Sequence, residues 1–190
     1  MADFFDKLEP AHAQMLTDAP LYFVATAAAE GRINLSPKGY DTLRVLSPET
    51  VAYLDLTGSG NETAAHLLQV NRITLMVCSF NRNALILRVY GSARSVKPGD
   101  AEWPELIAQF DELPGTRQIF VISVESVQTS CGYAVPQMEV VAERETLIKY
   151  AENKGPEGLA DYRQQKNLFS IDGFPTGWPA DAAHQQGIEK

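Results

Sequence analysis

Cysteine is scarce in this chain, which contains two cysteines in 190 residues. Cys78 and Cys131 stand far apart in strand-like surroundings, a setting typical of buried thiols rather than of a disulfide framework or a zinc site. None of the three histidines has companions that suggest metal ligation. The sequence therefore predicts no metal centre.

Basic clusters and long apolar runs are also missing. Lys and Arg number 16 against 24 Asp and Glu, which gives a net charge of −8 and a pI of about 4.9. Nucleic acids and anionic membranes both require a positive footprint, and no apolar run approaches the length of a membrane span. Residues 1–6 lack the basic start and apolar stretch of a signal peptide. We therefore expect no nucleic acid or membrane partner, and a cytoplasmic location.

The most informative segment that is present lies at residues 51–70. An apolar run at 51–56 enters a loop of small and polar residues, Thr57-Gly58-Ser59-Gly60-Asn61-Glu62-Thr63, and a helical pattern follows at 64–70. The first N–H groups of a helix have no partners inside it, and the positive end of the helix dipole lies there. Such a place suits a phosphate group, so the loop is interpreted as the phosphate end of a cofactor site.

Helix capping explains part of the same pattern. Ser59-Gly60-Asn61-Glu62 has the spacing of a capping box, in which Ser59 would cap the helix and Glu62 would reach back to it. Neither G-x-x-x-x-G-K-[ST] nor G-x-G-x-x-G within a βαβ unit is present. The loop by itself leaves both interpretations open.

The rest of the chain has the pattern of one mainly β domain in which 45% of residues are hydrophobic. About six strands, mostly joined by tight turns, predict an antiparallel barrel rather than a βαβ fold; the extended segments are 21–27, 33–36, 43–46, 51–56, 73–80, 85–96 and 117–129. Helices are expected at 11–17, 61–70 and 100–113, and two more at 139–154 and 157–167.

The order of these elements resembles the pyridoxamine 5′-phosphate oxidase-like family of FMN-binding split barrels. The resemblance covers roughly residues 15–130 and rests on a hairpin, the segment 34–39, the strand and polar loop at 51–63, a helix ending at Asn71-Arg72, and Leu87-Arg88-Val89-Tyr90-Gly91. It implies a six-stranded antiparallel split β-barrel with flanking helices over residues 1–133, and a helical C-terminal extension over 134–190. It also implies a homodimer that binds FMN at the dimer interface.

The resemblance assigns eight residues to the cofactor. Asn34, Ser36 and Lys38 would line the flavin side of the site. Ser59, Gly60, Asn61 and Thr63 belong to the loop that would meet the phosphate, and Arg88 would approach from the strand after the second hairpin. Independently of the resemblance, Asp55 is expected to hold a turn or to pair with a neighbouring arginine.

Two departures from the family pattern bear on function. The oxidase places an Arg-Lys pair after the serine of its phosphate loop, whereas this chain has Gly60-Asn61-Glu62. The arginine- and histidine-bearing motif that grips the vitamin phosphate is not found in 167–175. The sequence predicts an FMN-dependent oxidoreductase acting on a small molecule, and the two departures count against vitamin B6 oxidation. The alternative is a non-catalytic flavin- or haem-binding split-barrel module.

Overall fold

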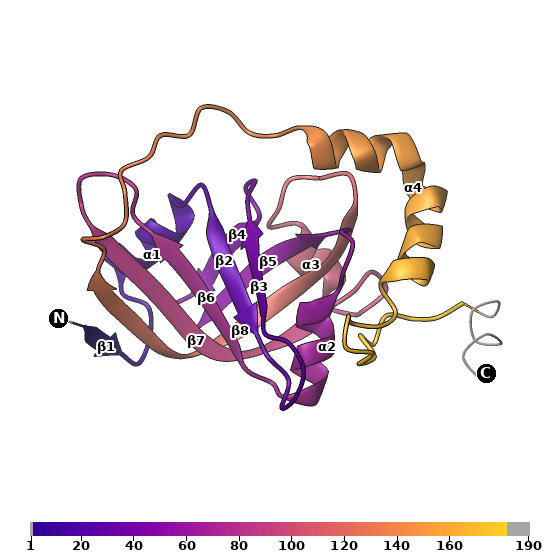
Figure 1. Cartoon of the computed structure of the whole chain (residues 1–190), viewed down its shortest axis with the longest axis horizontal. Coiled ribbons are helices and arrows are strands. Elements are labelled where there is room, and N and C mark those ends of the chain that lie inside the picture. Colours follow the sequence, from indigo (N-terminus) through magenta and orange to yellow (C-terminus); the bar gives the residue numbers. More distant parts are fainter. Residues whose placement is uncertain (1, 182–190) are drawn as a thin grey trace.

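The computed structural model describes residues 2–181 (Figure 1). Its helices are α1 (Pro10–Thr17), α2 (Glu62–Gln69), α3 (Trp103–Ile107) and α4 (Thr146–Lys166). Its strands are β1 (Asp3–Phe5), β2 (Tyr22–Thr26), β3 (Asn34–Lys38), β4 (Leu43–Ser47), β5 (Thr50–Leu56), β6 (Ile73–Cys78), β7 (Leu85–Val96) and β8 (Thr116–Cys131). None of the helices within the described residues is long and apolar enough to cross a membrane.

All eight strands join one antiparallel sheet in the order β3-β2-β6-β7-β8-β5-β4, and β1 pairs with β8. The end strands β3 and β4 are not paired, so the curved sheet stays open along one seam (Figure 1). This confirms the predicted split-barrel class. Seven of the eight strands correspond to the extended segments expected from the sequence, including β4. The eighth, β1, joins from the N-terminus by pairing with β8, a pairing between distant segments that no local pattern reveals.

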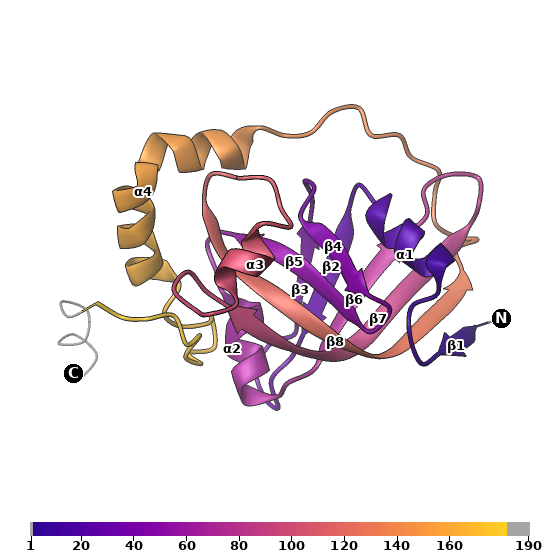
Figure 2. The same ribbon diagram turned by 180° about the vertical axis from the view of Figure 1, so that it is seen from behind.

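The barrel interior is apolar and closely packed. Strands β2, β6 and β7 alternate between buried and partly exposed positions, and Tyr53 of β5 stacks on Phe120 of β8 with ring centroids 5.0 Å apart. A second apolar cluster lies under α3, where Leu106 and Phe110 cover Ile119 of β8 (Figure 2). These clusters hold the strands that carry the polar site described below.

The register of β7 against β8 shifts between Tyr90 and Gly91, where Glu125 of β8 is an extra residue without a partner on β7. A Cβ at Gly91 would lie 2.0 Å from the carbonyl oxygen of Ser123, so only glycine permits the close approach of the two strands. A bulge of this kind increases the local twist of the paired strands, so the long β7–β8 pair can follow the curvature of the barrel.

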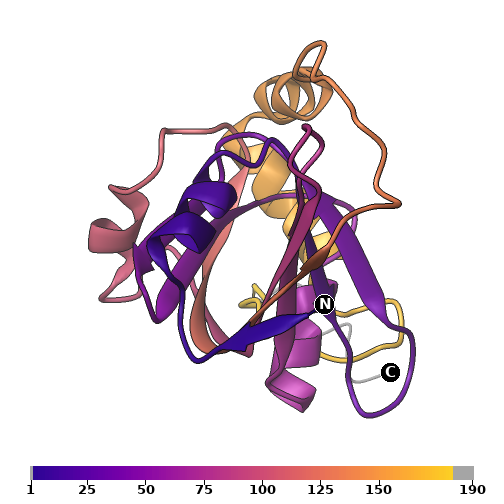
Figure 3. The same cartoon turned by 90° about the vertical axis from the view of Figure 1, so that its left-hand side faces the viewer.

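The C-terminal segment differs from the prediction before α4, whereas the break at Gly155 agrees with the two helices expected at 139–154 and 157–167. Residues 139–145 are extended instead of helical, and Met138 donates its N–H to the carbonyl of Phe80, because the chain is crossing the barrel there as a strap (Figure 3). Helix α4 then begins at Thr146 and is interrupted at Gly155, whose φ of 64° is left-handed. The helix predicted at 100–113 is shorter in the structure, because only residues 103–107 are helical and turns follow.

The boundary between a barrel domain ending at residue 133 and a C-terminal extension starting at residue 134 remains a prediction.

Candidate functional site

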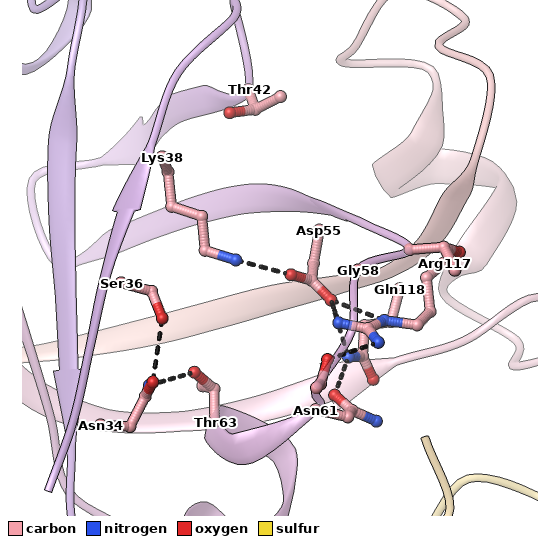
Figure 4. Close-up of polar contacts among 12 residues, drawn as sticks. Asn34, Ser36, Lys38, Thr42, Asp55, Gly58, Asn61, Thr63, Arg117 and Gln118 are labelled. Atoms are coloured by element: carbon pink, nitrogen blue, oxygen red, sulfur yellow. Dashed lines mark hydrogen bonds and ion pairs between the residues drawn. The ribbon is translucent and has the colours of Figure 1, made fainter. Parts of the chain in front are cut away.

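A cavity of about 450 Å³ opens at the unpaired seam of the barrel, between β3 and the end of β5. This volume falls within the range of ligand sites, roughly 300–1,000 Å³. Its lining comes from β3, the turn after it, the end of β5, the loop before α2, and the first residues of β8 and α4 (Figure 4). Segments that are distant in the sequence therefore meet around one polar hollow.

Strand β3 supplies one wall because its side chains alternate. Asn34, Ser36 and Lys38 are partly buried and line the cavity, whereas Leu35 is exposed and does not line it. Pro37 is tolerated because β3 is an edge strand. Ser36 donates to Asn34 Oδ1 at 2.9 Å, and Asn34 Nδ2 donates to Thr63 Oγ1 at 3.2 Å, which ties this wall to α2.

A buried ionic cluster forms the floor (Figure 4). Asp55 is 2% exposed and accepts from Lys38 Nζ at 2.8 Å and from Arg117 Nη2 at 2.7 Å. Gln118 Nε2 also donates to Asp55, at 2.9 Å. Burial by itself would raise the pKa of the Asp55 carboxyl, but the nearby Arg117 and Lys38 charges outweigh it and hold that pKa below its usual range. Asp55 is therefore an anion with two cations beside it.

The loop before α2 forms the third wall. Gly58, Ser59, Gly60 and Asn61 all line the cavity, and Asn61 is the N-terminal cap residue of α2. Asn61 is 2% exposed, its Oδ1 accepts from Gln118 at 2.7 Å, and its Nδ2 has no hydrogen-bond partner within the described residues. A buried donor without a partner is costly, so this nitrogen suggests a ligand atom.

The capping box expected from Ser59 and Glu62 does not form. A capping box would need Ser59 as the cap residue, but the cap residue is Asn61, two positions later. Glu62 is therefore the first residue of α2, and Ser59 lies outside the helix. The Glu62 carboxylate instead accepts the N–H of Ile171, at 3.0 and 3.2 Å. Glu62 is therefore occupied by the C-terminal segment.

Seven of the eight predicted cofactor residues line this cavity: Asn34, Ser36, Lys38, Ser59, Gly60, Asn61 and Thr63. Arg88 does not, since its guanidinium donates to Ser130 on the neighbouring strand β8 at 3.1 Å. A cofactor role for Arg88 stays a prediction, and it would need a second copy of the chain to bring Arg88 to the cavity.

Sequence reasoning missed Arg117 and Gln118. The expected pairing of Asp55 with an arginine is confirmed, but its partner lies 62 residues further along the chain. The one local feature that could have indicated them is the position of a charged and an amide residue directly before the apolar run at 119–122. Only the register of β5 on β8, which sets Asp55 opposite Gln118, shows where they act.

Fold and cavity together define a split β-barrel protein with a polar cavity at its open seam. The sequence profile of the pyridoxamine 5′-phosphate oxidase family matches residues 8–131. The pyridoxamine 5′-phosphate oxidase family protein ustO of Aspergillus flavus is 34% identical over 195 residues, covering 92% of this chain and 78% of its own. The chain belongs to the pyridoxamine 5′-phosphate oxidase family.

Solved structures agree on the fold. A Lactobacillus delbrueckii protein provisionally named a pyridoxamine 5′-phosphate oxidase superposes with a TM-score of 0.53 at 19% identity, covering 65% of this chain and 94% of its own. HupZ of Group A Streptococcus gives a TM-score of 0.50 at 19% identity, covering 63% of this chain and 91% of its own. These likenesses concern the barrel alone.

Proposed function

We propose that the chain binds FMN in the cavity at the seam and uses it as an oxidoreductase on a small-molecule substrate. The observation that carries the proposal is the loop 58–61: the carbonyls of Gly58 and Gly60 accept from Asn167 and Arg117, while the N–H groups of the loop have no acceptor in residues 2–181. Unpaired N–H groups at the start of a helix suit a phosphate. A homodimer and a cytoplasmic location belong to the same proposal.

The residues present fit this cofactor. Ser59, Asn61 and Thr63 would hold the phosphate with the loop amides, and a Cβ at Gly58 would meet nothing within 4 Å, so a ligand can approach the backbone closely. Asn34, Ser36 and Lys38 would line the flavin side, where donors and positive charge suit the polar edge of the ring system. Lys38 would supply that positive charge.

Bound FMN would supply the hydride chemistry. The chain's own residues would bind and orient it. Lys38, held at 2.8 Å from Asp55, keeps a fixed position on the cavity wall, and Leu54, Phe120 and Leu147 restrict the entry of water beside it.

The cavity suits haem less well. Haem iron takes axial ligands such as histidine, cysteine, methionine or tyrosine. Among the cavity residues the only one of these is Tyr40, whose hydroxyl donates to the carbonyl of Arg144 at 2.5 Å. This observation favours the flavin over the haem alternative.

The absorption spectrum of the purified protein tests the proposal. After incubation with FMN and removal of free ligand, we expect the visible bands of oxidised flavin in about one equivalent per chain, and their bleaching by a reductant. Retention of haem but not FMN would support the alternative module. Retention of neither would overturn the assignment of the cavity.

Replacement of Lys38 by methionine should lower the midpoint potential of the bound flavin. Reduced flavin is anionic, so loss of a nearby positive charge destabilises it; a change of 30 mV corresponds to about 1.4 kcal/mol for a two-electron couple. We expect a decrease of at least roughly 30 mV in a spectroelectrochemical titration. Arg94→Met removes an exposed cation that pairs with Glu102 away from the cavity, and should leave the potential unchanged. Equal potentials for Lys38→Met and wild type would place the flavin elsewhere.

A further inference from the structure

Asn167 lies directly after α4, outside residues 8–131 that match the family profile. Its side chain is fully buried, with a relative exposure of 0%. A buried amide must find hydrogen-bond partners, and those of Asn167 belong to the cofactor loop and to its support. The C-terminal segment thus reaches the site that the barrel forms.

The contacts of Asn167 hold the loop from behind. Its Nδ2 donates to the carbonyl of Gly58 at 3.1 Å, and its Oδ1 accepts from Arg117 Nη1 at 2.7 Å. The same Arg117 nitrogen donates to the carbonyl of Gly60 at 2.9 Å. Asn167 is itself anchored, because Thr176 Oγ1 donates to its carbonyl at 2.6 Å.

These bonds fix the direction of two peptide groups. In a trans peptide the carbonyl of one residue and the N–H of the next point in opposite directions, and the chain has no cis peptide bond within the described residues. Since the carbonyls of Gly58 and Gly60 point toward Asn167 and Arg117, the N–H groups of Ser59 and Asn61 point to the other side of the loop. Ser59 is exposed, and both Ser59 and Asn61 line the cavity.

Without such support the loop would have no fixed orientation. It contains two glycines, whose conformational freedom makes an ordered arrangement entropically costly. The buried Nδ2 of Asn61 is a further donor of this loop, and it has no hydrogen-bond partner within the described residues.

We propose that Asn167 is a positioning residue for the cofactor phosphate: it turns the amides of Ser59 and Asn61 toward the cavity by holding the carbonyl of Gly58 and the guanidinium of Arg117. The inference rests on the proposed function, since it concerns the same site. It assigns the segment after α4, which lies beyond the family match, an indirect part in recognising the phosphate, through the orientation of the loop.

Comparison of FMN with riboflavin, which lacks the phosphate, tests the inference. In Asn167→Ala the affinity for FMN should fall roughly tenfold or more, the equivalent of one hydrogen bond to a charged group, whereas the affinity for riboflavin should stay within about twofold. Asn167→Ser leaves a small polar group in the buried site and should show the same loss of affinity for FMN alone. It replaces the alanine variant in the experiment if that variant folds poorly. Fluorescence quenching of either flavin on the full-length chain gives both affinities.

Gln164→Ala is the matched control. Gln164 is an amide one turn earlier that also donates to a backbone carbonyl, that of Pro179 at 2.9 Å, without touching the loop. The ratio of the affinities for FMN and riboflavin should be the same in Gln164→Ala as in wild type. Equal losses for both flavins in the Asn167 variants, or no loss at all, would overturn the positioning role while leaving flavin binding intact. Wild-type protein that binds neither flavin would overturn the proposed function and this inference together.

Discussion

Replacement of Asp55 by asparagine should lower the free energy of unfolding by about 3–5 kcal/mol. The carboxylate is 2% exposed and balances Arg117, whose side chain is 4% exposed, together with Lys38. Asparagine keeps the shape but removes the charge, so a buried guanidinium would be left without a counter-ion. Urea unfolding followed by circular dichroism at neutral pH measures the effect.

Asp41→Asn is the control for this variant. Asp41 pairs with Arg44 at 2.6 Å, but its side chain is 72% exposed, so the loss should be no more than about 1 kcal/mol. Similar losses for both variants would show that the buried cluster adds nothing beyond a surface ion pair.

The cost of Asp55→Asn should also depend on pH. The pKa of Asp55 is lower in the folded than in the unfolded chain, so its contribution is complete above the unfolded pKa, about 3.9, and is lost as the pH falls toward the folded pKa. The difference in stability between wild type and Asp55→Asn should therefore narrow below about pH 4. A difference that stays constant between neutral pH and pH 3 would contradict the ionic origin of the effect.

Replacement of Asn61 by aspartate should weaken FMN binding by at least about 30-fold. Two like charges about 4 Å apart at an effective dielectric constant of about 20 repel by roughly 4 kcal/mol, and half of that already gives a loss of this size. The new carboxylate can still accept from Gln118, and aspartate is a favourable residue at the start of a helix. Titration with FMN and with riboflavin should show the loss for FMN alone.

Glu62→Gln makes the opposite change of charge at the next residue. Glutamine can still accept the N–H of Ile171, so the contact with the C-terminal segment is kept. Removal of the negative charge should leave FMN affinity unchanged or raise it. If Asn61→Asp binds FMN as tightly as wild type, the phosphate does not lie at this loop.

Much of the barrel could be predicted from local pattern. The β2–β3 hairpin and strands β5, β6, β7 and β8 lie within a few residues of the predicted segments because alternation and turn residues act over short distances. Helix α2 is likewise close to its predicted range. The strap at 139–145 was predicted as helix and is extended, since its conformation follows from where it crosses the barrel.

For the site, the sequence located the residues that lie within two short segments. The resemblance to the family named seven of the cavity residues, which lie on β3 and between Ser59 and Thr63. Whether Ser59 and Glu62 form a capping box could not be settled locally, because the competing partner of Glu62 is Ile171, 109 residues away.

The sequence by itself determined the strand pattern, the acidic and cysteine-poor character of the chain, and the loop that ends β5. Only the tertiary structure decided which charges meet. The register of β5 on β8 joins Asp55 to Arg117 and Gln118, and the return of the chain after α4 places Asn167 on Gly58, 109 residues away. Hydrogen bonds and ion pairs act over a few ångströms of space, so partners that far apart along the chain leave no trace in its local pattern.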